Sequence, residues 1–355
     1  MNNNDTNDPS QKDESSNSGN SGSELSSIDD QNLTGSPLFK DRKSGLIIFG
    51  ILQILMGLFC AMLIPLILLS QSVTPAGNSS TNVRMLVPAL GMYSILAVLL
   101  VWLGTGSILA RRWARALTLV LAWTWLVIGI TSMIIMVIFR PFPVANAAPG
   151  QQVPPQMYLF FLVVMLGTMG CIYILLPGIF IWFYRSPHVK ATCEYHDPHL
   201  RWTDRCPLPV LAISLMLGAG AFSMIFSASY GFVIPFFGIL LKGVVGGILT
   251  LGITLLFAYL SWATYKLKIW AWWATLILYV AFGLSSMITF SRLGLMEFYR
   301  EINLPEEQLR IIEQSGMIER MNMPVMIGVS GVVFIGYLFW IRKYFVSKSV
   351  PNVSS

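Results

Sequence analysis

The sequence predicts an all-α fold, a polytopic membrane helix bundle of about eight transmembrane helices. Three observations lead to this prediction. The 355 residues are 55% hydrophobic and 11% charged, whereas soluble proteins carry about a quarter charged residues. Long apolar stretches recur along the chain, and the basic residues gather in alternate connections between them.

A helix needs about 20 apolar residues to cross a hydrocarbon core of about 30 Å. The boundary between the fifth and sixth stretches is marked only by Pro235 and Lys242, which predicts a very short turn there. Eight stretches meet the length requirement: 45–70, 86–109, 113–139, 157–184, 209–233, 238–265, 269–292 and 323–345.

The distribution of Lys and Arg predicts that both chain ends are cytoplasmic, because short loops rich in these residues stay on that side. With this orientation, 16 of the 23 basic residues lie inside and 7 outside. The net charge of +6 therefore reflects topology, and we expect no nucleic-acid partner. Eight tryptophans fall near the predicted inner boundary: Trp113, Trp182, Trp202, Trp262, Trp270, Trp272, Trp273 and Trp340.

The apolar stretches also divide the chain into parts. Residues 1–36 are rich in Asn, Ser, Asp and Gly, and they hold too few apolar side chains to offset the entropy lost on folding. We expect a disordered cytoplasmic tail at 1–43, a first four-helix half at 44–184, a cytoplasmic connector at 185–208, a second four-helix half at 209–345 with an outer loop at 293–322, and a cytoplasmic C-terminal tail at 346–355.

The two halves form a candidate internal repeat of four helices plus four. Trp113 matches Trp270 and Thr118 matches Thr275 at one offset, and the blocks GITSMI and GLSSMI match at an offset three residues smaller. In the first and fifth stretches, the spacing from Gly50 to Pro65 recurs from Gly220 to Pro235. Because each half holds an even number of spans, the copies would share one orientation, related by an axis along the membrane normal. The alternative is chance matching among a few abundant apolar residue types.

The outer loop predicts a short helix within LPEEQLRIIEQSG. Pro305 suits a first-turn position, Glu306 suits a helix N-terminus, and Gly316 marks an end. The helix would have one apolar side, formed by Leu309, Ile311 and Ile312. That side either rests on the bundle or the headgroups, or binds a membrane-protein partner.

The connector contains CEYHDPHLRWTDRC, with four residues of the types that bind zinc: Cys193, His196, His199 and Cys206. Their spacing matches none of the usual zinc patterns, and Pro198 opposes placing both histidines on one helical face. We therefore interpret the segment as a turn-rich strap along the inner membrane face, without a metal or other cofactor.

The segment RRWAR in the second connection gives candidate lipid-headgroup contacts: Arg111, Arg112, Trp113 and Arg115. Arginines can bind anionic headgroups while a tryptophan anchors the interface. The alternative is that these charges only fix the topology of the chain.

The predicted spans contain no Asp, Glu or His. Buried ionisable groups are what proton relays and many cation-coupled carriers use, so their absence argues against such mechanisms. Candidate cavity-lining polar residues are Gln53, Ser227 and Tyr230, which could instead form interhelical hydrogen bonds.

These observations predict a multi-pass integral membrane protein that is a non-enzymatic accessory or organising component. The alternative is a transporter or channel for a neutral or lipid-like solute. A membrane enzyme is less favoured, because outside the N-terminal tail the acids and histidines lie only in the connector and the outer loop. The expected partner is the lipid bilayer, with a membrane protein at the outer loop, and the expected location is a bacterial plasma membrane.

Overall fold

The computed structural model describes residues 40–73, 83–139, 155–314, 318 and 321–346. The predicted N-terminal tail up to residue 39 and residues 347–355 of the C-terminal tail lie outside this part, as does Gly316. Every contact reported below belongs to the unit Arg42–Ser355.

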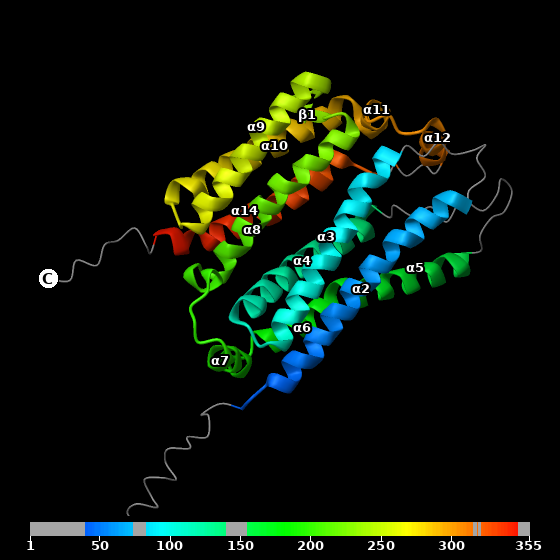
Figure 1. Cartoon of the computed structure of the whole chain (residues 1–355). Helices are drawn as coiled ribbons and strands as arrows, with labels where there is room; N and C mark the ends of the chain where they lie inside the picture. Colours follow the sequence, from blue (N-terminus) through cyan, green and yellow to red (C-terminus); the bar gives the residue numbers. More distant parts are fainter. Residues whose placement is uncertain (1–39, 74–82, 140–154, 315–317, 319–320, 347–355) are drawn as a thin grey trace, which may run out of the picture. The chain divides into compact units, whose positions relative to one another are not determined.

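The described residues of the first half form four of the spans, whose course Figure 1 shows. The fourth span contains a π-helical turn, because the N–H of Leu176 donates to the carbonyl of Cys171, five residues back, where an α-helix would use the residue four back. The next residue, Pro177, has no N–H and cannot donate to the preceding turn. The elements are α2 (Lys43–Val73), α3 (Val83–Ile108), α4 (Arg112–Phe139), and a fourth span of α5 (Pro155–Gly170), the π-helical η2 (Cys171–Leu175) and α6 (Leu176–Tyr184).

The described part of the second half forms the other four spans (Figure 1). They are formed by α8 (Leu208–Ser223) with the 3₁₀-helical η4 (Met224–Tyr230), α9 (Gly243–Tyr265), α10 (Ile269–Arg292) and α14 (Met323–Val346). Between the halves lie α7 (Pro187–His196) and η3 (Trp202–Arg205), and after α10 come α11 (Gly294–Glu301) and α12 (Glu306–Gln314).

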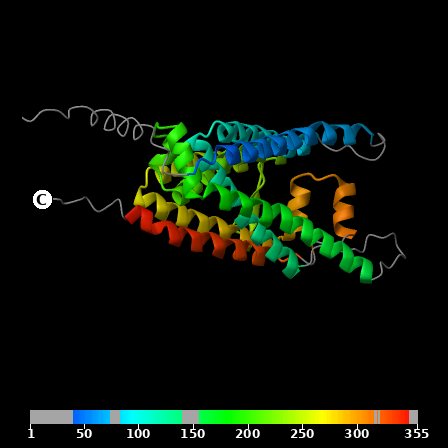
Figure 2. The same cartoon turned by 90° about the horizontal axis from the view of Figure 1, so that it is seen from below.

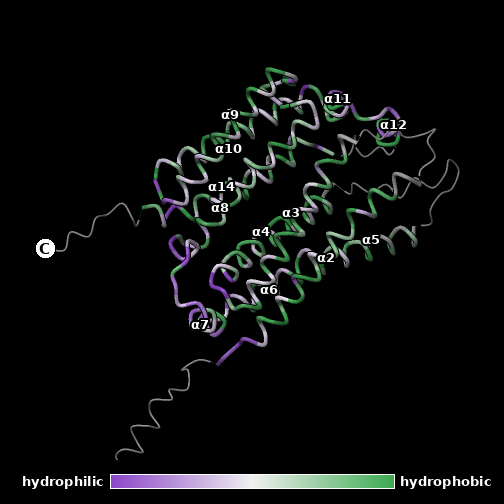
Figure 3. The backbone as a smooth tube through the Cα atoms, in the orientation of Figure 1, coloured by the Kyte–Doolittle hydropathy of each residue, from purple (hydrophilic) through white to green (hydrophobic). Residues whose placement is uncertain are grey.

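The described residues therefore include eight helical segments of 23 to 27 residues that are long and apolar enough to cross a membrane, as predicted. At most 39% of the most apolar window of any span is buried within the protein, so the rest requires an apolar solvent. Figure 3 shows hydrophobic residues along the spans and hydrophilic residues at their ends. The predicted all-α, multi-pass architecture is confirmed.

The predicted boundary between the fifth and sixth spans was wrong. Residues 238–241 were expected to begin the sixth helix, but they belong to a hairpin of β1 (Ile234–Phe236) and β2 (Ile239–Leu241). Pro235 cannot continue a helix, and Phe237 and Gly238 both have positive φ, which a two-residue type I′ turn requires. Side chains of α10 accept the N–H groups of this turn, since Phe237 N donates to Ser285 Oγ at 2.9 Å and Gly238 N to Thr289 Oγ1 at 2.9 Å.

The two ends of the unit differ in structure (Figure 1). We call the end with α7 and the α3–α4 and α9–α10 turns the connector end, and the end with β1, β2, α11 and α12 the hairpin end. The predicted outer-loop helix is present as α12, whereas α7 and α11 were not predicted. In α12, Ile311 is 57% exposed, so part of the predicted apolar side is uncovered.

Each half packs its first span against its second and its third against its fourth (Figures 1 and 2). The turns between second and third spans also correspond. Ala110 and Leu267 both have positive φ, and each N–H donates to the carbonyl three residues back, of Ser107 and Thr264 respectively. Ala110 and Leu267 are 157 positions apart in the sequence, and so are Trp113 and Trp270.

The first two spans of each half approach closely at one point. A Cβ at Gly104 of α3 would lie 2.6 Å from the carbonyl oxygen of Gly50 in α2, so only glycine allows this contact. In the second half, Ser214 Oγ donates to the carbonyl of Ser261 at 2.8 Å, and Ser261 Oγ donates back to that of Ser214 at 2.7 Å. Ser261 is again 157 positions after Gly104.

The halves have separate hydrophobic cores that meet at α4 and α8. One core contains Leu46 and Tyr184, and the other contains Trp272 and Leu338, with Val120 of α4 packed into it. Near the hairpin end, Phe226 of η4 lies where a side chain at Gly91 of α3 would be. Most tryptophans predicted at the interface are exposed, but Trp272 is 1% exposed, because its Nε1 donates to the carbonyl of Leu338 at 2.7 Å inside the bundle.

Candidate functional site

A chain of buried polar side chains connects all four spans of the first half near the connector end. The hydroxyl of Tyr184 on α6 donates to Ser107 Oγ on α3 at 2.8 Å, and Ser107 donates to Gln53 Oε1 on α2 at 3.3 Å. Gln53 Nε2 then donates to Thr118 Oγ1 on α4 at 3.1 Å. All four residues are at most 2% exposed. The chain therefore fixes how the four helices pack.

No such chain forms among the described residues of the second half. Thr264 and Thr275, which correspond to Ser107 and Thr118 at the 157-residue offset, are also buried, but their hydroxyls have no hydrogen-bond partner among the described residues. In the first half Gly104 contacts Gly50, and in the second half Ser261, which corresponds to Gly104, contacts Ser214. Ser214 therefore corresponds to Gly50, and Leu217, three residues further on, corresponds to Gln53. The apolar side chain of Leu217 cannot form a hydrogen bond with the hydroxyl of Thr264 or of Thr275.

Arg115 connects the polar chain to the connector end. Its Nε donates to the carbonyl of Tyr184 at 3.1 Å, which satisfies a carbonyl at the end of α6. At the corresponding position of the second half, Trp272 donates to the carbonyl of Leu338. In both halves, the first turn of the third span thus donates a side-chain N–H to the backbone of the fourth.

The connector binds the α3–α4 turn through Asp197, whose side chain is 1% exposed. Arg201 donates to both of its carboxylate oxygens, Nη2 to Oδ1 at 3.0 Å and Nε to Oδ2 at 3.1 Å. Arg111 Nη1 lies 3.8 Å from Oδ1, and the backbone N–H of Arg112 also donates to the carboxylate. A buried carboxylate is thus surrounded by donors from two segments.

Further contacts extend this attachment. Asp204 accepts the N–H of Arg201 at 3.0 Å and lies 3.9 Å from Arg112 Nη1. Thr192 Oγ1 accepts the N–H of Arg42 at 3.1 Å, and the Tyr265 hydroxyl of α9 donates to the carbonyl of Trp202 at 2.8 Å. The connector therefore contacts both halves of the bundle.

Burial by itself raises the pKa of Asp197, but the hydrogen bonds and charge of Arg201, with smaller contributions from Arg112 and Arg111, outweigh it and hold the pKa below its usual range. The same pairing raises the pKa of Arg201. The carboxylate is therefore ionised at neutral pH, and the pair is a permanent attachment rather than a proton donor.

The cysteines and histidines of the connector are separated in the structure. Cys193 belongs to the core of the first half and Cys206 to the core of the second. Burial raises the pKa of Cys193 to about 12, which keeps it in the thiol form rather than the thiolate that binds metals. His196 Nδ1 lies 3.0 Å from the carbonyl of Thr192. Among the described residues, no three His, Cys, Asp or Glu side chains lie close enough to hold a metal ion.

The other predicted site residues have the following positions. Arg111, Arg112 and Arg115 have partners within the protein, and the ring of Trp113 stacks on Trp102 with 4.2 Å between centroids. Contact of these four residues with lipid headgroups stays a prediction.

The predicted cavity-lining residues are not together. Gln53 lies in the polar chain, whereas Ser227 and Tyr230 belong to η4 near the hairpin end, and Ser227 Oγ donates within its own helix to Met224 at 2.6 Å. Sequence reasoning missed Asp197 and Asp204 as partners of the arginines. Their opposite charge in the connector, which faces the α3–α4 turn, was the available signal.

Comparisons with protein-family models, with curated proteins and with solved structures gave no match for this chain.

Proposed function

We propose that this multi-pass membrane protein is a non-enzymatic accessory or organising component of a cell membrane, with both chain ends cytoplasmic and the connector end facing the cytoplasm. The observation that carries the proposal is the use of the polar groups inside the spans. Gln53, Ser107 and Thr118 bond one another between helices, and the eight spans contain no carboxylate or imidazole that could transfer a proton.

The partner surface that we propose is α12. This helix is amphipathic and lies outside the eight membrane spans, and its Ile311 side chain is 57% exposed. The preceding α11 is attached to the bundle by buried Leu295 and by the ion pair of Lys242 with Glu301 at 2.7 Å. An apolar side chain on an anchored helix outside the lipid suits contact with another membrane protein.

The test is affinity purification of the full chain from its native membrane after crosslinking. We expect a stoichiometric membrane-protein partner that is lost on deleting Leu304–Gly316 and strongly reduced by Ile311→Ser. The matched control is Glu313→Gln, an exposed residue of the same helix. Recovery of the chain alone, or a partner unaffected by both changes, would count against the proposal.

A second candidate is a carrier of a neutral or lipid-like solute, built from two parallel repeats. The matching turns at Ala110 and Leu267, with equal offsets for Gly104 and Ser261, support an internal repeat, which many carriers possess. Uptake of a neutral solute into proteoliposomes, abolished by truncating Gln53 and Tyr230, would favour the carrier over the accessory role.

A further inference from the structure

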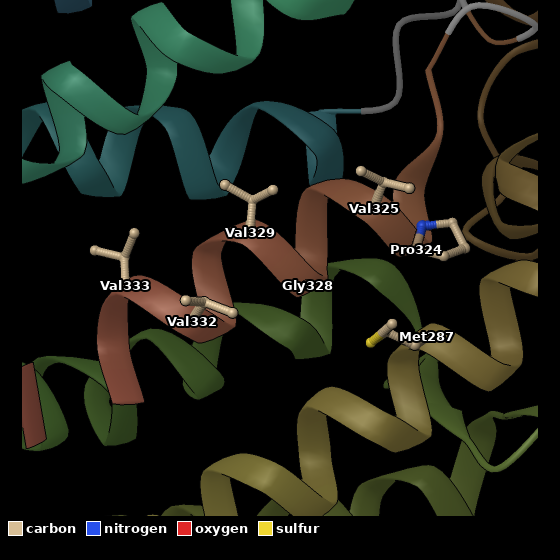
Figure 4. Close-up of a pocket in the computed structure, with 7 residues that line it drawn as sticks. All are labelled: Met287, Pro324, Val325, Gly328, Val329, Val332 and Val333. Carbon is tan, nitrogen blue, oxygen red and sulfur yellow. The ribbon is translucent and has the colours of Figure 1, made fainter. Parts of the chain in front are cut away.

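Two adjoining cavities follow the hairpin-end part of α14. The first, of about 490 Å³, is lined entirely by apolar residues: Met287 of α10 and Pro324, Val325, Gly328, Val329, Val332 and Val333 of α14 (Figure 4). The second, of about 580 Å³, includes Pro324 and Val325 and extends past Ser291, Leu295 of α11 and Asn322. One continuous groove therefore passes from apolar to mixed polar surroundings.

The groove exists because the contact between α10 and α14 loosens along their length. At the connector end, Trp272 bonds Leu338, and the rings of Tyr279 and Phe334 stack at 4.0 Å. Towards the hairpin end, Gly328 has no side chain, and a Cβ there would meet only Met287 Cε at 3.8 Å. No described residue of α14 before Leu338 is buried.

The length of the groove corresponds to one membrane leaflet. Val333 follows Pro324 by nine residues, which is about 14 Å of helix, close to half of a hydrocarbon core of about 30 Å. Val332 is 72% exposed at the open side, so a chain can enter laterally from the bilayer.

The polar end can hold the ester region of a lipid. Asn322 Oδ1 accepts the N–H of Val325 at 3.2 Å, so its amide N–H groups are directed elsewhere and can donate to a carbonyl. Ser291 Oγ donates to the carbonyl of Met287 at 2.8 Å and retains acceptor capacity. Among the described residues, those that line the two cavities carry no charge, so the polar groups available there are the amide of Asn322 and the hydroxyl of Ser291, which suit an ester carbonyl.

We propose that this groove binds a glycerolipid from the leaflet at the hairpin end, with one acyl chain between Met287 and α14 and an ester carbonyl at Asn322. The inference is independent of the accessory role proposed above, because it rests on α10 and α14 rather than on α12.

The test uses the full chain in phosphatidylcholine vesicles that contain a tracer phosphatidylcholine with a photoreactive acyl chain. After irradiation, mass spectrometry maps the labelled residues. We expect labelling at Met287 to exceed that on exposed faces of α9, such as Val244 and Ile248, by about fivefold or more. Gly328→Leu should reduce labelling at Met287 to the level of those faces.

The matched control is Gly331→Leu on the same helix, where a side chain would meet nothing within 4 Å and which is not among the residues lining the groove. It should leave labelling at Met287 unchanged. Met287→Trp fills the groove from α10 and provides a second blocking variant, read by labelling at Val329, should Gly328→Leu fail to fold. Uniform labelling of all exposed faces, or persistent labelling in both blocking variants, would overturn the proposal. Crosslinks from groove residues to a second copy of the chain would overturn it in favour of self-association.

Discussion

At the scale of single residues, the most informative side chain is Gln53, the one amide within the first span. Both ends of the amide are used, one to donate to Thr118 and one to accept from Ser107. Removing a buried partner leaves the remaining hydroxyl unsatisfied, which costs more than the net contribution of the bond.

We therefore expect Gln53→Leu to lower the free energy of unfolding by about 1 to 3 kcal/mol, although the volume is nearly conserved. Equilibrium unfolding in mixed micelles measures this difference. The control is Ser94→Ala on α3, which removes only a bond to Leu90 in its own helix and should change stability by less than about 0.5 kcal/mol.

The attachment of the connector to the α3–α4 turn through Asp197 is expected to be sensitive to acid. Because the pKa of Asp197 in the folded protein is below the usual aspartate range, the ionised form stabilises the fold above that range, and this contribution is lost as the pH falls through the lowered pKa. The thermal midpoint of the wild type should fall between about pH 4 and the lowered pKa. Asp197→Asn should be less stable at pH 7 and should lack this acid-dependent step.

The control for that experiment is Glu194→Gln, which removes an exposed pair with Lys190 at 3.9 Å. It should keep the full acid dependence of the wild type. An unchanged pH profile in Asp197→Asn would show that other groups cause the acid sensitivity.

At the scale of elements, the pair α2 and α3 is defined by the contact of Gly50 with Gly104. An alanine at position 104 would place its Cβ 2.6 Å from a backbone oxygen, and backbone cannot move aside as a flexible side chain can. We expect Gly104→Ala to destabilise the protein by about 1 to 3 kcal/mol.

The control for Gly104→Ala is Gly178→Ala on α6, where a Cβ would meet nothing within 4 Å. Because alanine is the better helix former, this change should be neutral or stabilising by up to about 1 kcal/mol. Thermal unfolding in detergent followed by circular dichroism compares the two variants. Equal effects would contradict a specific close contact at Gly104.

The element boundaries also show what the sequence could predict. Span number and approximate limits follow from apolar length alone, because the bilayer imposes that length. The hairpin at 234–241 was missed because its residues are as apolar as the spans, and the turn was marked only by Pro235 and Lys242, of which Lys242 lies just after the hairpin. The amphipathic α12 was found from its capping residues, whereas α11, which begins at Gly294 with positive φ directly after α10, was missed because its eight residues were assigned to the outer loop.

At the scale of the whole molecule, the correspondence between positions of the two halves leads to a testable prediction for Leu217, the counterpart of Gln53. If it occupies the position of Gln53, a glutamine there should reach the unpartnered hydroxyls of Thr264 and Thr275. Leu217→Gln should then cost less than about 1 kcal/mol, whereas Leu211→Gln in the same helix and core should cost the usual 1 to 3 kcal/mol of an unpaired buried amide.

Equal destabilisation by the two substitutions would argue against the repeat. The sequence suggested the repeat from a few matching residues, and the shared spacing of Gly50–Pro65 and Gly220–Pro235 put the first spans in a register six residues away from the one that the helix contacts give, in which Ser214 corresponds to Gly50. That register depends on close contacts between α2 and α3, and between α8 and α9, which pair residues of different types, glycine in one half and serine in the other.

The attachment of the connector limits how the halves can move. Asp197 holds the connector to the α3–α4 turn, and Tyr265 holds it to α9, so the hydrogen bonds and ion pairs of the connector tie the two halves together at the connector end. Any rocking motion of one half against the other is therefore expected to pivot about the connector end, with the largest displacement at the hairpin end. Spin labels across the halves should report a narrow distance distribution near the pivot and a broader one at the opposite tips.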